Sequence, residues 1–123
     1  MKKEAIGRAV GTASLVFGIT DMLLSHRFGR GIGAGREMGG RLFQIAGARE
    51  IATGIAGLVA PASVAPLKWR LAGDMFDLAA LGYIAAPSNP RRKAAWLAIG
   101  IVAGVALADL MALRAVEKRR ATN

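Results

Sequence analysis

The sequence contains no cysteine and a single histidine, His26. Without cysteine the chain forms no disulfide, no thiolate nucleophile and no cysteine-ligated iron–sulfur cluster. One histidine cannot supply both axial ligands of a bis-histidine haem, and it leaves a histidine-based zinc site short of ligands. We therefore predict neither a metal site nor a cofactor.

No run of about 18 uncharged residues occurs, so the simplest signature of a transmembrane helix is missing. Hydrophobic residues nevertheless make up 54% of the chain. The run from Trp96 to Ala108 has no polar residue on any side of a helix, and such a helix must be buried all round or lie in lipid. Because 123 residues cannot wrap several such helices in protein, we predict an integral membrane protein rather than a soluble alanine-rich bundle.

Strand-like alternation of useful length is also absent, and all four prolines lie between the apolar segments, where they cannot break a helix. The segments predict one all-α domain, a four-transmembrane-helix bundle with the N- and C-termini on the same side. Its helices cover about 5–24, 41–60, 67–86 and 94–113. A cleaved signal peptide is the alternative for the first segment, but Asp21 lies late in it and no small-residue cleavage site follows.

The formal net charge is +9, which by itself is compatible with nucleic-acid binding. The lysines and arginines lie in short clusters beside apolar runs, however, and this arrangement favours anionic lipid headgroups over nucleic acid. Slightly more lysines and arginines fall on the membrane side that holds the two termini than on the other side. Because positive residues favour the cytoplasmic side, we predict cytoplasmic termini. The predicted headgroup-binding residues are Arg27, Arg30, Arg36, Arg41, Lys118, Arg119 and Arg120.

The stretch between the first two predicted helices, residues 25–40, is rich in glycine and arginine. Its spacing does not match the phosphate-cradling G-x-G-x-x-G motif, no strand precedes it, and no Gly-Lys-Ser/Thr follows. We expect a flexible interfacial loop whose arginines contact lipid phosphates, and not a nucleotide site.

Several charged residues lie inside the predicted helices. Residues three, four and seven apart share a helix face, so Arg70, Asp74 and Asp77 line one stripe of the third helix. A central Asp costs up to ~3 kcal/mol on insertion, whereas a leucine returns only ~0.5 kcal/mol. This helix therefore needs a partner, and Arg49 in the second helix is the predicted one. The predicted buried ionic network comprises Arg49, Glu50, Arg70, Asp74, Asp77, Asp21 and Asp109.

This network has two arginines against five carboxylates. Three explanations stay open: some groups lie near the headgroups, some carboxyls stay protonated, or a cation or partner supplies the balance. The pairs either serve only to fix the helix register or handle protons or a substrate.

Glycine is abundant, with 16 residues. The predicted helix-packing residues are Gly47, Gly54, Gly57, Gly100 and Gly104. The first three share a stripe of the second helix, where they allow another backbone to approach closely. The last two form a small-xxx-small pattern on the fourth helix, and we expect this face to pack against a neighbouring helix or a second copy of the chain.

Several short pieces of the chain carry a family resemblance: Gly47-Ala48-Arg49-Glu50-Ile51, Trp69-Arg70, Ala72-Gly73-Asp74 and Asp77-Leu78, with a late Asp109 in an apolar helix. The pattern, spanning about 7–114, resembles a bacterial family of small four-helix membrane proteins. Its members are sometimes joined to or encoded beside polyketide cyclase/dehydrase-like lipid-binding domains. This chain departs from the family in its more glycine-rich first loop and in having no cyclase-like domain. The resemblance implies an integral membrane protein and supplies no settled activity. We expect its location to be a bacterial inner membrane.

Three functions follow as hypotheses. The first is a membrane binding or scaffold module held together by Arg–carboxylate contacts. The second is an oligomeric transporter or channel in which Glu50, Asp74 or Asp77 carries protons or cations. The third, a membrane enzyme acting on lipid or quinone, has the least support, so we favour a non-enzymatic role. The predicted partners are the lipid bilayer, a second copy of the chain, and a membrane or lipid-binding protein, with no nucleic acid.

Overall fold

The computed structural model describes residues 3–122, except for the side chains of residues 3, 36–38 and 119–122. This part of the chain contains no strand, and the predicted all-helical class is confirmed. The five helices are α1 (Lys3–Leu23), α2 (Ser25–Gly31), α3 (Arg36–Val59), α4 (Ala65–Ile84) and α5 (Arg92–Thr122).

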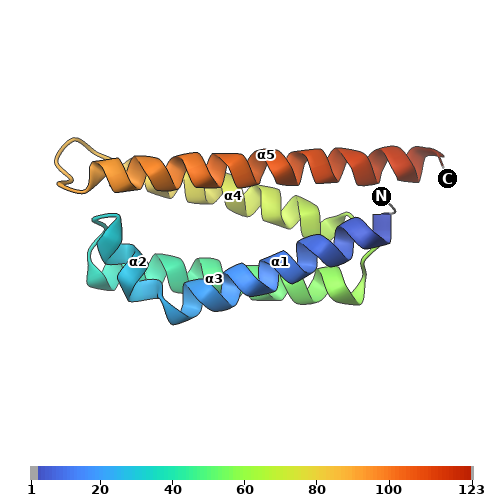
Figure 1. Cartoon of the computed structure of the whole chain (residues 1–123), viewed down its shortest axis with the longest axis horizontal. Coiled ribbons are helices and arrows are strands. Elements are labelled where there is room, and N and C mark those ends of the chain that lie inside the picture. Colours follow the sequence, from blue (N-terminus) through green and yellow to red (C-terminus); the bar gives the residue numbers. More distant parts are fainter. Residues whose placement is uncertain (1–2, 123) are drawn as a thin grey trace.

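The four long helices form two antiparallel pairs (Figure 1). α1 packs most extensively against α3, and α4 packs against α5. The start of α1, the α3–α4 connection and the end of α5 lie at one end of the molecule. α2 and the α4–α5 connection lie at the opposite end, so successive long helices run in opposite directions.

The expected flexible loop over residues 25–40 is wrong. α2 begins at residue 25, and its Phe28 ring stacks at a tilt on Phe43 of α3, with ring centroids 5.3 Å apart. Only residues 32–35 connect α2 to α3. Gly33 and Gly35 have φ of 79° and 84°, a region that glycine enters without a Cβ clash, so the turn is short enough for both helices to continue up to it.

Two other helix boundaries differ from the sequence-based prediction. α5 does not end near residue 113 but continues to Thr122, because the basic tail consists mostly of good helix formers. Pro66 lies in the first turn of α4 and not between helices, since the backbone N–H that proline lacks has no intrahelical partner at that position.

The side chain of Asn89, which is 8% exposed, joins the α4–α5 connection to α2. Its Nδ2 donates to the carbonyl oxygen of Ile32 at 2.9 Å and to that of Ile84 at 2.8 Å. Its Oδ1 accepts from the backbone N–H of Arg91 at 2.8 Å. One side chain thus satisfies the C-terminal end of α4 and fixes the position of the residues after α2.

Glycines on both helices bring α1 and α3 into backbone contact. A Cβ atom added at Gly54 would lie 2.8 Å from the carbonyl oxygen of Gly11, and one at Gly47 would lie 2.8 Å from that of Gly18. At Gly57 the added atom would lie 3.3 Å from the Cα of Gly11. The prediction that these three α3 glycines admit a neighbouring backbone is confirmed.

The other two predicted packing glycines lie on an open surface. Gly100 and Gly104 are exposed on α5, and an added Cβ would meet no atom within 4 Å in the described part of the chain. They therefore do not pack against a helix of the same chain, because the small-residue face of α5 is turned away from α4. Packing against a second copy stays a prediction.

Within the described residues, three helical segments are long and apolar enough to cross a membrane: Glu4–Leu23, Gly39–Val59 and Arg92–Lys118. The fourth predicted crossing is α4, whose 20 residues span about 30 Å, the thickness of a hydrocarbon core. α4 falls outside this set because it carries Lys68, Arg70, Asp74 and Asp77, and the cost of those charges outweighs its apolar residues.

Two apolar clusters lie at opposite ends of the bundle. The cluster at the α2 end comprises Ile32, Ala34, Leu81, Ile84, Ala85 and Ala95. The cluster at the end of the termini comprises Ile6, Leu67, Leu113 and Val116. Polar and charged side chains are also buried inside the bundle, among them Ser14, Glu50, Thr53, Arg70, Asp74 and Asp109. Large apolar side chains face outward on every long helix: Ile19 is 50% exposed, Ile55 52%, Met75 52% and Leu107 58%.

Candidate functional site

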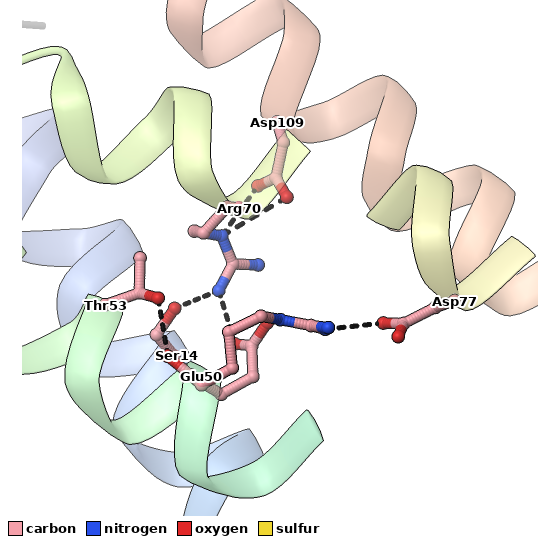
Figure 2. Close-up of polar contacts among 7 residues, drawn as sticks. Ser14, Glu50, Thr53, Arg70, Asp77 and Asp109 are labelled. Atoms are coloured by element: carbon pink, nitrogen blue, oxygen red, sulfur yellow. Dashed lines mark hydrogen bonds and ion pairs between the residues drawn. The ribbon is translucent and has the colours of Figure 1, made fainter. Parts of the chain in front are cut away.

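Arg70 of α4 is the centre of the buried polar network, and its side chain is 4% exposed (Figure 2). Its Nη1 donates to Oε2 of Glu50 on α3 at 2.6 Å and to the hydroxyl of Ser14 on α1. Its Nε donates to both carboxylate oxygens of Asp109 on α5, at 3.1 and 3.2 Å. One guanidinium therefore links all four long helices.

The local sequence explains why Ser14 can reach this guanidinium. Ser14 is fully buried, and it lies three residues after Gly11 and four before Gly18, on the α1 face that contacts α3. A small side chain preserves the close approach of the helices, while its hydroxyl accepts a hydrogen bond. Sequence reasoning missed this contact, although a lone polar residue within a glycine face is a signal that could have found it.

A second ion pair joins α3 to α4. Nη2 of Arg49 lies 2.8 Å from Oδ2 of Asp77, and the two side chains are 24% and 26% exposed. The predicted partnership of Arg49 with the third long helix is thus confirmed. Gly73 makes room for it, because a Cβ there would lie 2.6 Å from Nε of Arg49. The hydroxyl of Thr53 donates to the Arg49 carbonyl oxygen at 2.6 Å.

Asp74 has a different environment from the other acidic residues. It is 3% exposed, and its Oδ2 has no hydrogen-bond partner among the described residues. Its carboxyl group lies beside that of Asp109 and near Arg70 and Glu50. Because the Arg70 guanidinium bonds to Glu50 and Asp109, Asp74 is left without an ion pair in the described part of the chain.

Asp21, near the end of α1, is half-buried and faces Glu50, Asp77 and Arg49. The structure therefore brings all seven residues of the predicted network into one region, although Asp21 makes no ion pair with a described residue. The network divides into the Arg70 cluster, the Arg49–Asp77 pair, and two carboxylates that have no arginine of their own.

A cavity of about 490 Å³ lies between the two helix pairs. Its walls are mainly apolar and include Phe17, Phe43, Phe76, Leu97 and Ile101. The ionisable side chains that line it are Asp21, Arg27, Arg49, Glu50, Arg70, Asp74 and Asp77. An apolar space thus ends at the ionic network.

The basic residues predicted to bind headgroups lie mostly on the outside. Arg27, Arg30, Arg41 and Lys118 are exposed, and Arg27 also lines the cavity. The side chains of the remaining three predicted residues, Arg36, Arg119 and Arg120, lie outside the described part of the structure.

Among the described residues, no three His, Asp or Glu side chains are grouped as a metal ion requires. Comparison with models of protein families, with curated proteins and with solved structures finds no match. The family resemblance carried by the Arg49-Glu50 and Gly73-Asp74 pieces therefore stays a prediction, and a function has to be argued from the geometry.

Proposed function

We propose that the chain is an integral membrane binding protein with four transmembrane helices, and that its cavity accepts an apolar or amphipathic molecule from the bilayer. The observation that carries this proposal is an apolar cavity of about 490 Å³ that ends at a buried ionic network.

The outer surface supports a membrane location. Three described helices are long and apolar enough to cross, and large apolar side chains such as Ile45 and Leu107 face outward near the middle of their helices. A surface of this kind is costly in water, whereas hydrocarbon solvates it. Polar groups such as Arg70 are inside the bundle, where they find one another.

The Arg70 contacts support α4 as a fourth crossing. Glu50 lies within the candidate span Gly39–Val59, and Asp109 lies within Arg92–Lys118. A helix whose arginine pairs with both carboxylates must lie at the same depth as those two spans. Once Arg70 and Asp77 are paired, their charges no longer face lipid, so the main objection to inserting α4 is much reduced.

The cavity has the properties of a small-molecule site. Known ligand pockets have volumes of roughly 300–1,000 Å³, with mostly apolar walls and a few placed polar groups. In this protein the apolar walls come from α1, α3, α4 and α5, and the polar groups lie where those helices meet. A lipid-soluble molecule with an apolar body and a polar end fits this distribution.

The number of crossings is tested by labelling single cysteines, since the natural chain has none. Ala62→Cys lies in the α3–α4 connection and Ser88→Cys in the α4–α5 connection. Four crossings place the two thiols on opposite sides of the membrane, so an impermeant maleimide added to sealed vesicles should label only one. Labelling of both from the same side would show that α4 does not cross.

Binding is tested with dodecanol, an apolar chain with one polar end, and purified protein in non-ionic detergent. Native mass spectrometry should detect one bound dodecanol per chain, and Ile101→Trp should weaken this binding because Ile101 lines the cavity. Leu107→Trp is the matched control, since Leu107 is as exposed on the same helix but does not line the cavity. Equal effects of the two substitutions, or no bound dodecanol, would refute the site.

A second candidate function is proton- or cation-coupled transport. The observation in its favour is that two arginines accompany five carboxylates in the network, so protons or cations can compensate the excess negative charge. Purified protein in liposomes that contain a pH-sensitive dye should then carry a flux that Asp77→Asn abolishes without unfolding the bundle. Absence of flux under every imposed gradient would remove this candidate.

A further inference from the structure

We propose that the cavity selects an amphiphile with a primary amine head group, and that the buried carboxylate of Asp74 binds this head group. The inference rests on the proposed function, because it specifies the ligand class of the same cavity. It depends on three features: an unpartnered acceptor, an unbalanced charge, and an apolar wall that leads to both.

The unpartnered acceptor is Oδ2 of Asp74. This atom has no hydrogen-bond partner among the described residues, although Asp74 is only 3% exposed and lines the cavity. A buried acceptor left unsatisfied is costly, so the site favours a ligand that brings a donor. A primary ammonium group supplies N–H donors and, unlike an alcohol, a positive charge.

The charge balance at the network favours a cation. Arg70 bonds to Glu50 and Asp109, and Arg49 bonds to Asp77. Asp74 therefore makes no ion pair with a described residue, and although Arg70 lies nearby, its charge is shared with the Asp109 and Glu50 carboxylates, which add negative potential around Asp74. One bound ammonium would oppose this potential, whereas a carboxylate head group would add to it.

The apolar wall of the cavity determines which kind of apolar chain the ligand carries. Leu97, Ile101 and Val105 follow one another along α5 at spacings of four residues, so they line one side of the cavity in a row. Phe17 and Phe76 contribute wall on the facing helices. An alkyl chain that lies along this row brings its head group toward the network, so a single-chain amine matches both parts of the site.

Arg27 also lines the cavity, and its positive charge would favour an acidic head group over an amine. Arg27 is exposed on α2, whereas Asp74 is buried, and a desolvated charge discriminates between ligands more strongly than a hydrated one. The structure therefore assigns the selection to Asp74. A fatty acid is the appropriate competing ligand in the test.

The test compares dodecylamine, dodecanol and dodecanoic acid on the wild-type chain in non-ionic detergent at pH 7, with binding measured by native mass spectrometry. Charge-assisted hydrogen bonds exceed neutral ones by enough to predict that the amine binds about ten-fold or more tighter than the alcohol. The acid should bind more weakly than either. Asp74→Asn should bring the amine to the affinity of the alcohol, while the exposed surface control Glu117→Gln should leave the series unchanged.

The outcomes separate this inference from the proposed function. Equal binding of the amine and the alcohol by the wild type would overturn the amine assignment and leave a general apolar site standing. Binding of none of the three would overturn both. If Asp74→Asn does not fold, Asp21→Asn tests the competing position, because Asp21 is the other cavity-lining carboxylate without an ion pair among the described residues. Loss of the preference in Asp21→Asn would refute the role of Asp74.

Discussion

Removal of the Arg70 guanidinium is the most informative perturbation of this protein. Arg70→Met keeps an unbranched apolar side chain in place but leaves Glu50 and Asp109 without their cation. Both carboxylates are in the interior, with side chains 11% and 6% exposed. Removing one partner of a buried ion pair costs about 3–5 kcal/mol, because the remaining charge is stranded.

The expected loss is at the upper part of that range for two reasons. Two carboxylates are stranded and not one, and Asp74 beside them makes no ion pair with a described residue. By contrast, Arg49→Met breaks a single pair whose side chains are about a quarter exposed. Only one carboxylate, Asp77, loses its cation there, so the loss should be smaller than for Arg70→Met. Arg70 should therefore contribute more to stability than Arg49.

The assay is unfolding by SDS in mixed micelles, followed by loss of helical circular dichroism. Arg70→Met should lower the free energy of unfolding by about 3–5 kcal/mol, and adding Glu50→Gln with Asp109→Asn should recover most of the loss because neutral amides need no counter-charge. Equal losses for Arg70→Met and Arg49→Met would refute the assignment of Arg70 as the central link. Failure of the triple variant to recover stability would refute the electrostatic explanation.

Three further predictions use the same assay. Gly54→Ala should destabilise by about 1–3 kcal/mol, because the new Cβ meets the α1 backbone, whereas Gly100→Ala should be neutral or slightly stabilising; the same sign for both would contradict the backbone contact. Exchanging Arg49 and Asp77 (Arg49→Asp with Asp77→Arg) should restore most of the stability that either single change loses, and additive losses would argue against their pairing. Asn89→Ala should cost about 1–3 kcal/mol, since two backbone carbonyls lose their donor, and a loss below the error of the assay would show that neither bond matters.

The sequence predicted one feature of the site at the level of a contact. Arg49 was expected to pair with the acidic stripe of the third long helix, and it pairs with Asp77. That prediction succeeded because a four-residue spacing fixes which side chains share a helix face, and because an unpaired arginine in an apolar helix is too costly to leave open. Both arguments are local, so they need no knowledge of the fold.

The partners of Arg70 could not be predicted in the same way. Its contacts with Glu50, Asp109 and Ser14 come from three other helices, and they depend on the rotation and height of each helix in the bundle. A change of about 100° in helix rotation, the angle between successive residues, would exchange Glu50 for Arg49 at the same position. The sequence contains the charges, but helix packing selects the pairs.

The sequence by itself determined the helical class, the approximate position of the long helices, and the necessity for the embedded charges to find one another. Those properties follow from apolar run length, proline placement and the cost of an unpaired charge, which are all local. Only the tertiary structure decided that α2 is a helix, that Oδ2 of Asp74 has no hydrogen-bond partner among the described residues, and that the two helix pairs leave a cavity between them. The physical reason is that a cavity and an unsatisfied acceptor both depend on how the helices pack against one another. Side chains distant in the sequence contribute to both.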